Sequence, residues 1–157
     1  MTAGSLARIL ELRAEVSPEA AALHGDDGRS WTNREADRAA GAISRALADA
    51  GVRPGDRVAT YVTNGPELAL LLFGAWKLGA VPVTISSLYN EHELAESIAK
   101  TRPVLLIADG ARPSVVAAQE GIPVRTLSGA LDGVAALAWA DAADGAGGHS
   151  PGVDVVA

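Results

Sequence analysis

Two adjacent serines, Ser86 and Ser87, are the polar residues best placed for chemistry in this sequence. They end a predicted strand, and open α/β sheets bind their ligands at the carboxyl ends of strands. A hydrolytic serine would stand in a Gly-x-Ser-x-Gly turn and would need a correctly placed histidine. Neither serine has that turn around it. The pair therefore marks a position where a ligand could bind, and no nucleophile is assigned to it.

The three histidines, His24, His92 and His149, are the next candidates for catalysis or metal binding. None has a second histidine three or four positions away, the spacing that places two ligands on one helix face. His92 stands between Glu91 and Glu93, but adjacent residues on a helix point apart, so neither carboxylate can orient the ring. We interpret all three as surface histidines.

Acidic residues form two groups that could be considered for a metal. One is Asp26 and Asp27, and the other is Asp141, Asp144 and Asp154. Their neighbours are mostly Gly and Ala, without the dense oxygen-ligand pattern of a calcium loop. Exposed carboxylates without a partner ion are therefore expected, and no metal ligand is assigned.

Phosphate-binding loops of the two common kinds are missing from the sequence. There is no Gly-x-Gly-x-x-Gly after the first strand and no Gly-x-x-x-x-Gly-Lys-Ser/Thr. The glycine-rich residues 145–148 follow no predicted strand and predict a linker. Trp31 and Trp76 are interpreted as core residues rather than as ligand-stacking rings. No catalytic, cofactor-binding or metal residue is assigned, and no cofactor is expected for this chain alone.

The composition limits both the core and the partners. The chain has 157 residues, of which 48% are hydrophobic and only 4% aromatic, so one domain with a core of small aliphatic side chains is expected. A formal net charge of -6 gives no basic surface for nucleic acid or an anionic membrane. The absence of cysteine excludes disulfides and thiolate metal sites.

No targeting or membrane-spanning segment is recognised. The first eight residues lack the basic and apolar regions of a secretory signal. The most apolar segment, Leu68 to Trp76, has about half the ~20 residues that cross a bilayer. A cytoplasmic location is therefore expected.

The N-terminal part alternates helix and strand patterns. Apolar residues at helical spacing predict a helix from Ser5 to Glu15. Residues 25–28, Gly-Asp-Asp-Gly, lie between two short apolar runs and predict a β-hairpin. Thr32 and Glu35 have the spacing of a capping box, so a helix begins there and ends near Gly51.

The rest of the ordered pattern predicts strands separated by helices. Strands are predicted at Arg57 to Thr63, Ala80 to Ile85, Val104 to Ala108 and Ile122 to Leu127, the last at a sheet edge because it carries Pro123. Helices are predicted at Leu68 to Leu78, covered on most sides, at Glu91 to Lys100 and at Pro113 to Gly121. This alternation predicts an α/β fold: a doubly wound, mostly parallel sheet with flanking helices and a small N-terminal β-ribbon. From Ser128 the Ala, Gly and Asp content predicts a loose helix and then a linker.

Several segments occur in the order found at the start of AMP-forming acyl-CoA synthetases, which the sequence resembles over about residues 5 to 130. They are Ser30-Trp31-Thr32, residues 51–59 (GVRPGDRVA), residues 64–67 (NGPE), residues 77–83 (KLGAVPV) and residues 87–94 (SLYNEHEL). Glycines at turns and helix ends make these scaffold motifs rather than catalytic ones.

The resemblance implies that residues 1–130 are the N-terminal α/β part of an AMP-binding domain, incomplete relative to the family's N-terminal domain, and that residues 131–157 are a tail or linker. Family enzymes use ATP, Mg and coenzyme A to convert a carboxylic acid into an acyl-adenylate and then a thioester. Their phosphate loop, nucleotide motifs and C-terminal lid have no counterpart in these residues. The resemblance therefore implies a fragment of a fatty acid-CoA ligase, inactive alone, whose partner is the missing C-terminal remainder or a second copy.

Two alternatives remain open at this point. The chain could be a stand-alone, non-catalytic binding or interaction module derived from that family. It could also be a small α/β nucleotide-binding protein of another class.

Overall fold

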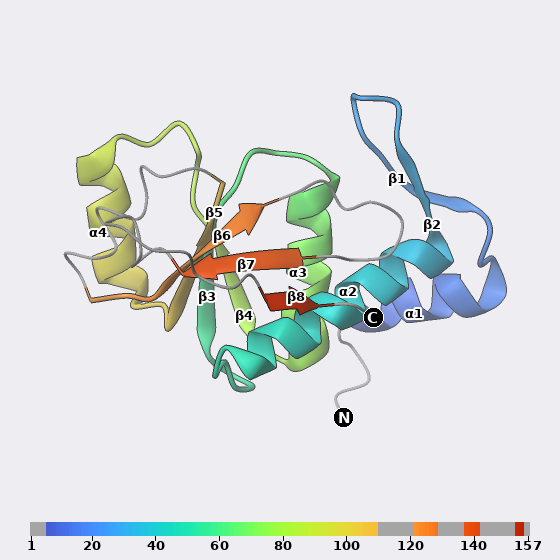
Figure 1. Cartoon of the computed structure of the whole chain (residues 1–157), viewed down its shortest axis with the longest axis horizontal. Helices are drawn as coiled ribbons and strands as arrows, with labels where there is room; N and C mark the ends of the chain where they lie inside the picture. Colours follow the sequence, from blue (N-terminus) through green and yellow to red (C-terminus); the bar gives the residue numbers. More distant parts are fainter. Residues whose placement is uncertain (1–5, 110–120, 129–136, 142–152, 156–157) are drawn as a thin grey trace.

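The computed structural model describes residues 6–109, 121–128, 137–141 and 153–155. The elements in chain order are α1 (Leu6–Val16), β1 (Ala21–His24), β2 (Ser30–Thr32), α2 (Asn33–Asp49), β3 (Arg57–Tyr61), α3 (Pro66–Leu78), β4 (Val81–Thr84), α4 (Glu91–Thr101), β5 (Leu105–Ala108), β6 (Val124–Ser128), β7 (Leu137–Asp141) and β8 (Val153–Val155). Helix α1 and the β1–β2 hairpin lie at one end of the molecule and α4 lies at the other, while α2 runs from the hairpin end towards the sheet (Figure 1).

The main sheet has six strands in the order β4-β3-β5-β6-β7-β8. Strands β4, β3, β5 and β6 run parallel, whereas β7 and β8 are antiparallel additions. The parallel pairing of β3 with both β4 and β5 confirms the parallel sheet expected from the sequence. Parallel neighbours need crossover connections, and α3 and α4 supply them.

Alternate residues of each central strand pack into different cores. In β5, Leu105 and Ile107 pack with α2 and α3, whereas Leu106 packs with α4. In β3, Val58 joins the α2–α3 core and Ala59 joins the α4 core. A strand alternates its side chains between the two faces of a sheet, so α3 and α4 cover opposite faces. The doubly wound fold is therefore confirmed.

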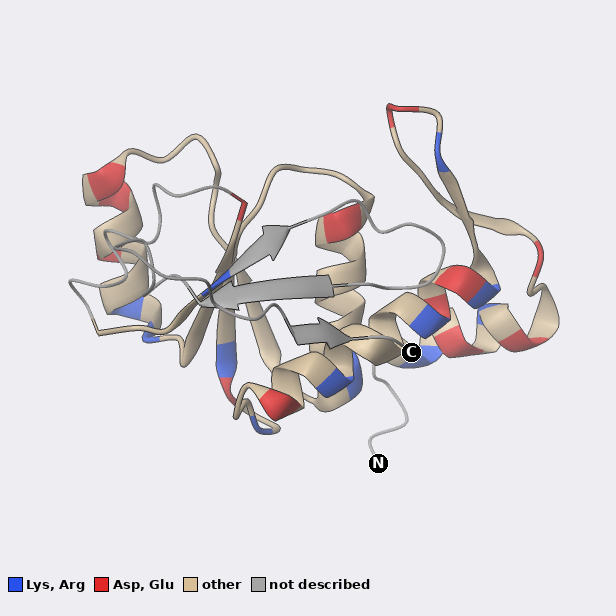
Figure 2. Ribbon diagram, viewed as in Figure 1, with Lys and Arg blue, Asp and Glu red and all other residues tan. Residues whose placement is uncertain are grey.

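Helix starts are set by local hydrogen bonds. Thr32 accepts from the Glu35 amide, and the Glu35 carboxylate accepts from the Thr32 amide, so the predicted capping box is present. A second capping box, formed by Asn90 and Glu93, begins α4 and was not identified from the sequence. Acidic residues lie in the first turn of α4 and a basic residue lies in its last turn (Figure 2). This distribution of charge is favourable for the helix dipole.

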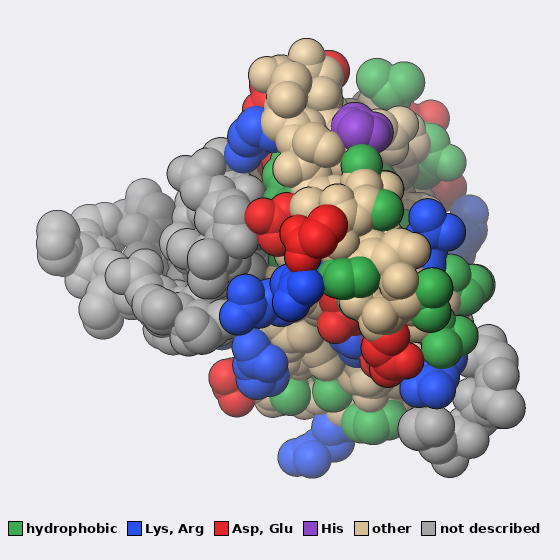
Figure 3. Space-filling view, turned by 90° about the vertical axis from the view of Figure 1, so that its right-hand side faces the viewer, with side chains coloured by type: hydrophobic (Ala, Val, Ile, Leu, Met, Phe, Trp, Pro, Cys, Tyr) green, Lys and Arg blue, Asp and Glu red, His purple; other side chains and the backbone are tan. Residues whose placement is uncertain are grey.

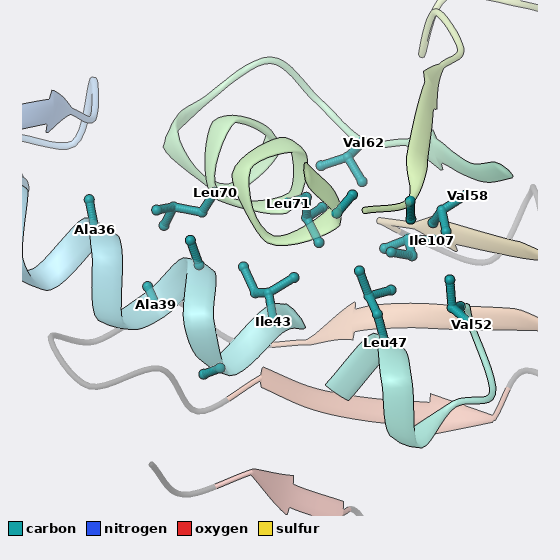
Figure 4. Packing of buried hydrophobic residues seen from close by; sticks show 14 of the residues in the cluster. Ala36, Ala39, Ile43, Leu47, Val52, Val58, Val62, Leu70, Leu71 and Ile107 are labelled. Atoms are coloured by element: carbon teal, nitrogen blue, oxygen red, sulfur yellow. The ribbon is translucent and has the colours of Figure 1, made fainter. Parts of the chain in front are cut away.

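The larger core is built from α2, α3 and the sheet. Along α2, Ala36, Ala39, Ile43 and Leu47 point towards α3 and the sheet, where Leu71 is among the residues that meet them (Figure 4). Most of the α2 contributors are alanines, as the aromatic-poor composition predicts. Small side chains allow the two helices to approach closely.

Helix α3 is covered along its whole length. Leu70, Leu71, Gly74 and Ala75 are buried, and every other residue of the helix is at least partly buried. The helix ends at Gly79, whose φ of 83° is a left-handed conformation that favours glycine. The expectation of a helix covered on most sides is confirmed.

Two expectations for the C-terminal part are wrong, and one lies outside the described residues. The strand predicted at Ile122 to Leu127 is β6, but it is no edge strand: it pairs with β5 and with β7, and Pro123 precedes it. The loose helix predicted from Ser128 is wrong at residues 137–141, which form β7 because β6 offers them a pairing edge. The helix predicted at Pro113 to Gly121 falls almost entirely outside the described residues, and the domain division at residue 130 stays a prediction.

None of the helices in the described part of the chain combines the length and the apolar character that a membrane span requires.

Lys77 joins three helices through ion pairs. Its Nζ lies 2.8 Å from Glu11 Oε1 on α1 and 2.9 Å from Asp37 Oδ1 on α2. Burial favours the neutral amine, but the hydrogen bonds and charges of Glu11 and Asp37 outweigh it and raise the pKa of Lys77 above its ordinary value.

Replacing Lys77 by Met is expected to lower the free energy of unfolding at pH 7 by about 1.5–3 kcal/mol, the range for hydrogen bonds to charged groups. Because the folded-state pKa is raised, this contribution is complete below the ordinary lysine pKa of about 10.4 and is lost as the pH rises through the folded value. Urea denaturation at pH 7 and pH 11 measures both effects. Lys100→Met is the control, since Lys100 is 74% exposed beside Glu96 and its loss should change stability by less than about 0.5 kcal/mol. Equal losses for the two variants would contradict the role assigned to Lys77.

Candidate functional site

A cleft of about 370 Å³ lies at the carboxyl ends of β3 and β4. We call it the β3–β4 cleft, and it is lined by Thr60, Val62, Asn64, Leu68, Thr84, Ile85, Ser86, Ser87, Leu88 and Tyr89. The two serines singled out from the sequence therefore lie together in a cleft, at the sheet edge where they were expected.

The topology creates the opening. Strand β3 leads into α3 on one face of the sheet, whereas the neighbouring β4 leads into α4 on the other face. Open α/β sheets bind ligands outside the carboxyl ends of their strands, where the strand order reverses. In the order β4-β3-β5-β6 that reversal lies between β3 and β5, so the β3–β4 cleft is at the same edge of the sheet and shares β3 with the switch point.

The loop from Ser86 to Tyr89, which forms one wall of the cleft, is joined to β3 through the Tyr61 side chain. The Tyr61 hydroxyl lies 2.9 Å from the Ser87 carbonyl oxygen and 3.0 Å from that of Tyr89, and it donates to this pair. The Leu88 amide donates to Ser86 Oγ at 3.3 Å. Tyr61 extends from the α4 face of the sheet, so one side chain connects the second core to the wall of the cleft.

Thr60 is the unusual residue of the cleft. It is 2% exposed, and its Oγ1 is buried without a hydrogen-bond partner. A buried hydroxyl of this kind costs free energy, and native proteins keep few of them. Sequence reasoning missed Thr60 because a threonine in a buried strand looks like any β-branched residue. Its position at the carboxyl end of a parallel strand was the available signal.

Replacing Thr60 by Val should raise the free energy of unfolding by about 1–2 kcal/mol, because the shape is kept while the unsatisfied hydroxyl is removed. Thr84 supplies a matched control. It pairs with Thr60 across β3 and β4 but is exposed, so Thr84→Val should change stability by less than about 0.5 kcal/mol. Thermal and urea unfolding measure both variants. A clear loss of stability in Thr60→Val would show that the hydroxyl has a partner in solution.

The other candidate residues are dispersed. His24 lies in the hairpin, 3.1 Å from Ser30 Oγ, while His92 lies on α4 with its side chain 84% exposed and 3.9 Å from Glu96. Neither lines the β3–β4 cleft. His149 falls outside the described residues.

The acidic candidates also stay apart from the cleft. Asp27 accepts hydrogen bonds from the backbone and the side chain of Arg29, which lower the pKa of its carboxyl group below the ordinary value. Asp141 is in β7 and Asp154 in β8, and Asp144 is outside the described residues, as are residues 145–148. Within the described ranges no group of His, Asp and Glu has an arrangement suited to a metal ion.

The two tryptophans singled out from the sequence pack in the interior or against an aromatic neighbour. Trp31 is 4% exposed in the larger core, with the Arg29 guanidinium 5.4 Å from its ring centroid. Trp76 is partly buried and meets Phe73 edge to face at 5.4 Å. Trp31 is therefore a core side chain, as interpreted, whereas Trp76 is only partly buried and belongs to neither core cluster.

Comparisons with known proteins give one consistent result. A family model described as AMP-binding enzyme matches residues 10–151. The chain is similar to 4-coumarate--CoA ligase 3 of Oryza sativa subsp. japonica, with 32% identity over 123 residues, which is 76% of this chain and 22% of that protein. It is also similar to feruloyl-CoA synthase of an Amycolatopsis species, with 36% identity over 122 residues, 76% of this chain and 24% of that protein.

The fold is similar to that of a solved structure, VinN, with a TM-score of 0.74 and 24% identity. That match covers 79% of this chain and 32% of VinN, and at this identity it shows the fold alone. The chain thus spans about a quarter of the length of these two curated relatives.

Proposed function

Because the chain belongs to the AMP-binding enzyme family of adenylate-forming ligases, we propose that it is the N-terminal part of an acid–CoA ligase. Such an enzyme converts a carboxylic acid into an acyl-adenylate with ATP and then transfers the acyl group to coenzyme A. The observation that carries the proposal is the family match over residues 10–151, together with two relatives named as CoA ligase and CoA synthase.

The described residues do not fit ATP or Mg by themselves. No Lys, Arg, Asp or Glu is among the residues that line the β3–β4 cleft, so the cleft supplies neither a cationic side chain for a triphosphate nor a carboxylate for a divalent cation. We assign ATP, Mg and coenzyme A to the remainder of the protein. The contribution of this chain is a rigid parallel sheet on which the remainder assembles, and the chain alone is inactive.

The acid is proposed to be hydrophobic. The sequence favoured a fatty acid, whereas the relatives named above carry the names of aromatic acids, 4-coumarate and ferulate. Both kinds present a large apolar body beside one carboxylate. We therefore propose a fatty or arylpropenoic acid as substrate, in a cytoplasmic enzyme.

Acid-dependent exchange of pyrophosphate into ATP tests this function. The protein encoded by the whole open reading frame is expected to exchange with palmitate or with 4-coumarate and to form the corresponding CoA thioester. The 157-residue chain is expected to show no exchange above background. Exchange by the chain alone, or none by the longer protein with a panel of acids, would refute the proposal.

Exposed apolar residues support a proposal about partners. On α1, Leu6, Ile9, Leu12 and Val16 are 43–79% exposed, and they fall on one side of the helix. Figure 3 shows hydrophobic side chains between charged ones at the end of the molecule that α1 and the hairpin form. The edge strand β4 adds Val81, although Pro82 removes one backbone donor there.

We expect the isolated chain to self-associate through such surfaces, which the remainder of the protein would otherwise cover. Sedimentation velocity over a hundredfold concentration range should show an increase in mean mass. Ile9→Glu, which places a charge in the apolar side of α1, should reduce it, while Glu15→Gln on the same helix should not. A monodisperse monomer at every concentration would contradict self-association and favour the stand-alone module.

A further inference from the structure

We propose that the β3–β4 cleft binds an uncharged ligand that carries an amide group next to an apolar portion. The proposal concerns a site in this chain alone, and it does not depend on the acid–CoA ligase function. Three features of the cleft carry it: its uncharged hydrogen-bonding walls, the unpartnered hydroxyl of Thr60 and an apolar rim.

The walls offer hydrogen bonds without charge. Hydroxyl groups come from Thr84, Ser86 and Ser87, and an amide comes from Asn64, all four in exposed residues. No ionisable side chain apart from the Tyr89 phenol belongs to the lining. An anion or a cation would therefore lose hydration without gaining a counter-ion, whereas a neutral amide can both donate and accept here.

Two groups at the cleft have no hydrogen bond from a side chain: the Thr60 hydroxyl and the start of helix α3. Thr60 Oγ1 has no hydrogen-bond partner. Helix α3 begins next to the cleft at Gly65, with no side-chain cap, and Asn64 and Leu68 on either side of that start both line the cleft. Pro66 has no amide hydrogen and Glu67 stands in the first turn, so the remaining first-turn amides can donate to a neutral carbonyl oxygen while the Glu67 carboxylate disfavours an anion. A hydroxyl can accept the amide hydrogen. A single amide group on a ligand meets both needs, because its carbonyl oxygen can accept from the helix start and its N–H can donate to the Thr60 hydroxyl.

The remaining lining is apolar and extends to the rim. Val62, Leu68 and Ile85 lie in the lining, and Leu88 and Tyr89 stand at the rim with 91% and 38% exposure. An apolar part of a ligand bound in the cleft would cover these two side chains. The ligand is therefore amphipathic rather than a plain polyol.

Access to Thr60 requires movement of the loop. Its Oγ1 has no contact with solvent in this state. The segment beside Thr60 in the cleft lining, Ser86 to Tyr89, is exposed. The Leu88 and Tyr89 amides donate to Ser86 within the segment, and the Tyr61 hydroxyl joins the segment to β3. Few hydrogen bonds need to change for the loop to open, and local opening of such segments costs little. Binding is thus expected to order the loop around the ligand.

Benzamide and benzoate form a matched pair for the test, because they share a ring and a planar head group but differ in charge. Titration of each into the ¹⁵N-labelled chain is followed by amide chemical shifts. Benzamide is expected to bind with a dissociation constant in the millimolar range and to shift the signals of Ser86 to Tyr89. Benzoate is expected to bind at least about tenfold more weakly.

Variants show whether Thr60 takes part. Thr60→Val should weaken benzamide binding about threefold to tenfold, Thr60→Ser should keep it, and Ser97→Ala on α4, outside the cleft, should leave it unchanged. Circular dichroism confirms that each variant is folded. The proposal is overturned if benzamide shifts no cleft signal, if benzoate binds as tightly, or if Thr60→Val binds as the unchanged chain does.

The ligase proposal is tested by exchange activity of the longer protein, so the two can fail separately. If benzamide did not bind but the longer protein exchanged pyrophosphate, only the proposed ligand of the cleft would be refuted. If benzamide bound but the longer protein exchanged no pyrophosphate, only the proposed ligase function would be refuted.

Discussion

Replacing Gly74 by Ala is expected to lower the free energy of unfolding by about 2–3 kcal/mol, although the same substitution usually stabilises a helix. Gly74 is buried in α3 where that helix crosses α2. A Cβ built on Gly74 would lie 2.3 Å from Ile43 Cγ2, 2.6 Å from Ile43 Cβ and 3.1 Å from the Ala40 carbonyl oxygen. Inserting a methyl group into such a contact typically costs about 1–3 kcal/mol and forces the helices apart.

The reason this cost cannot be avoided by local adjustment is the chemistry of the neighbours. Ile43 Cβ is fixed to the backbone of α2, and the Ala40 oxygen is part of that backbone. Neither can rotate away, so relief requires a shift of α2 relative to α3. Helical propensity favours Ala over Gly by up to about 1 kcal/mol, which offsets only part of the strain.

Gly41→Ala is the matched control. Gly41 is in the middle of α2, and its added Cβ would meet only the Arg45 guanidinium, at 3.7 Å. This variant should be unchanged or up to about 1 kcal/mol more stable. Urea unfolding of both variants gives the comparison. If Gly74→Ala were as stable as Gly41→Ala, the close approach of α2 and α3 would not exist in solution.

Local chemistry explains which parts of the fold could be predicted from the sequence. Thr32 and Glu35 specify a helix start by two reciprocal hydrogen bonds, and Gly79 supplies the left-handed residue that ends α3. These signals act over a few residues, so one sequence suffices to recognise them. The apolar strands β3 and β5, separated by helical segments, then leave few alternatives to a parallel sheet.

Contacts between distant residues explain what could not be predicted. Residues 137–141 form β7 only because β6 offers them an edge, and their own composition does not favour a strand over a helix. The glycine at position 74 is explained by Ile43, which lies in another helix and is 31 positions away in the sequence.

The candidate site was predictable only in part. Ser86 and Ser87 could be placed at the carboxyl end of a strand from the pattern alone. The sequence does not distinguish Thr60 from a core residue. The distinction comes from the pairing of β4 with β3 and from the missing hydrogen-bond partner of the Thr60 hydroxyl. Side chains from two different strands line one cleft only if those strands are adjacent in the sheet. A single sequence is a weak guide to the order of strands in a sheet.

Replacing Leu71 by Ala is expected to lower the free energy of unfolding by about 2–5 kcal/mol, the range for a buried leucine. Leu71 is 2% exposed and packs in the larger core with residues of α2 and the sheet (Figure 4). The loss combines the removed apolar contacts with a cavity that the surrounding helices cannot fill, since α2 and α3 are already in contact at Gly74. Leu72→Ala is the control in the next position of the same helix.

Leu72 is only partly buried, so its truncation should cost about 1–2 kcal/mol, clearly less than at Leu71. The two substitutions change helix propensity equally, and the difference between them therefore reports burial on the two sides of α3. Guanidinium unfolding with a common m-value gives that difference directly. A loss at Leu72 as large as at Leu71 would mean that the outer side of α3 is also enclosed in solution.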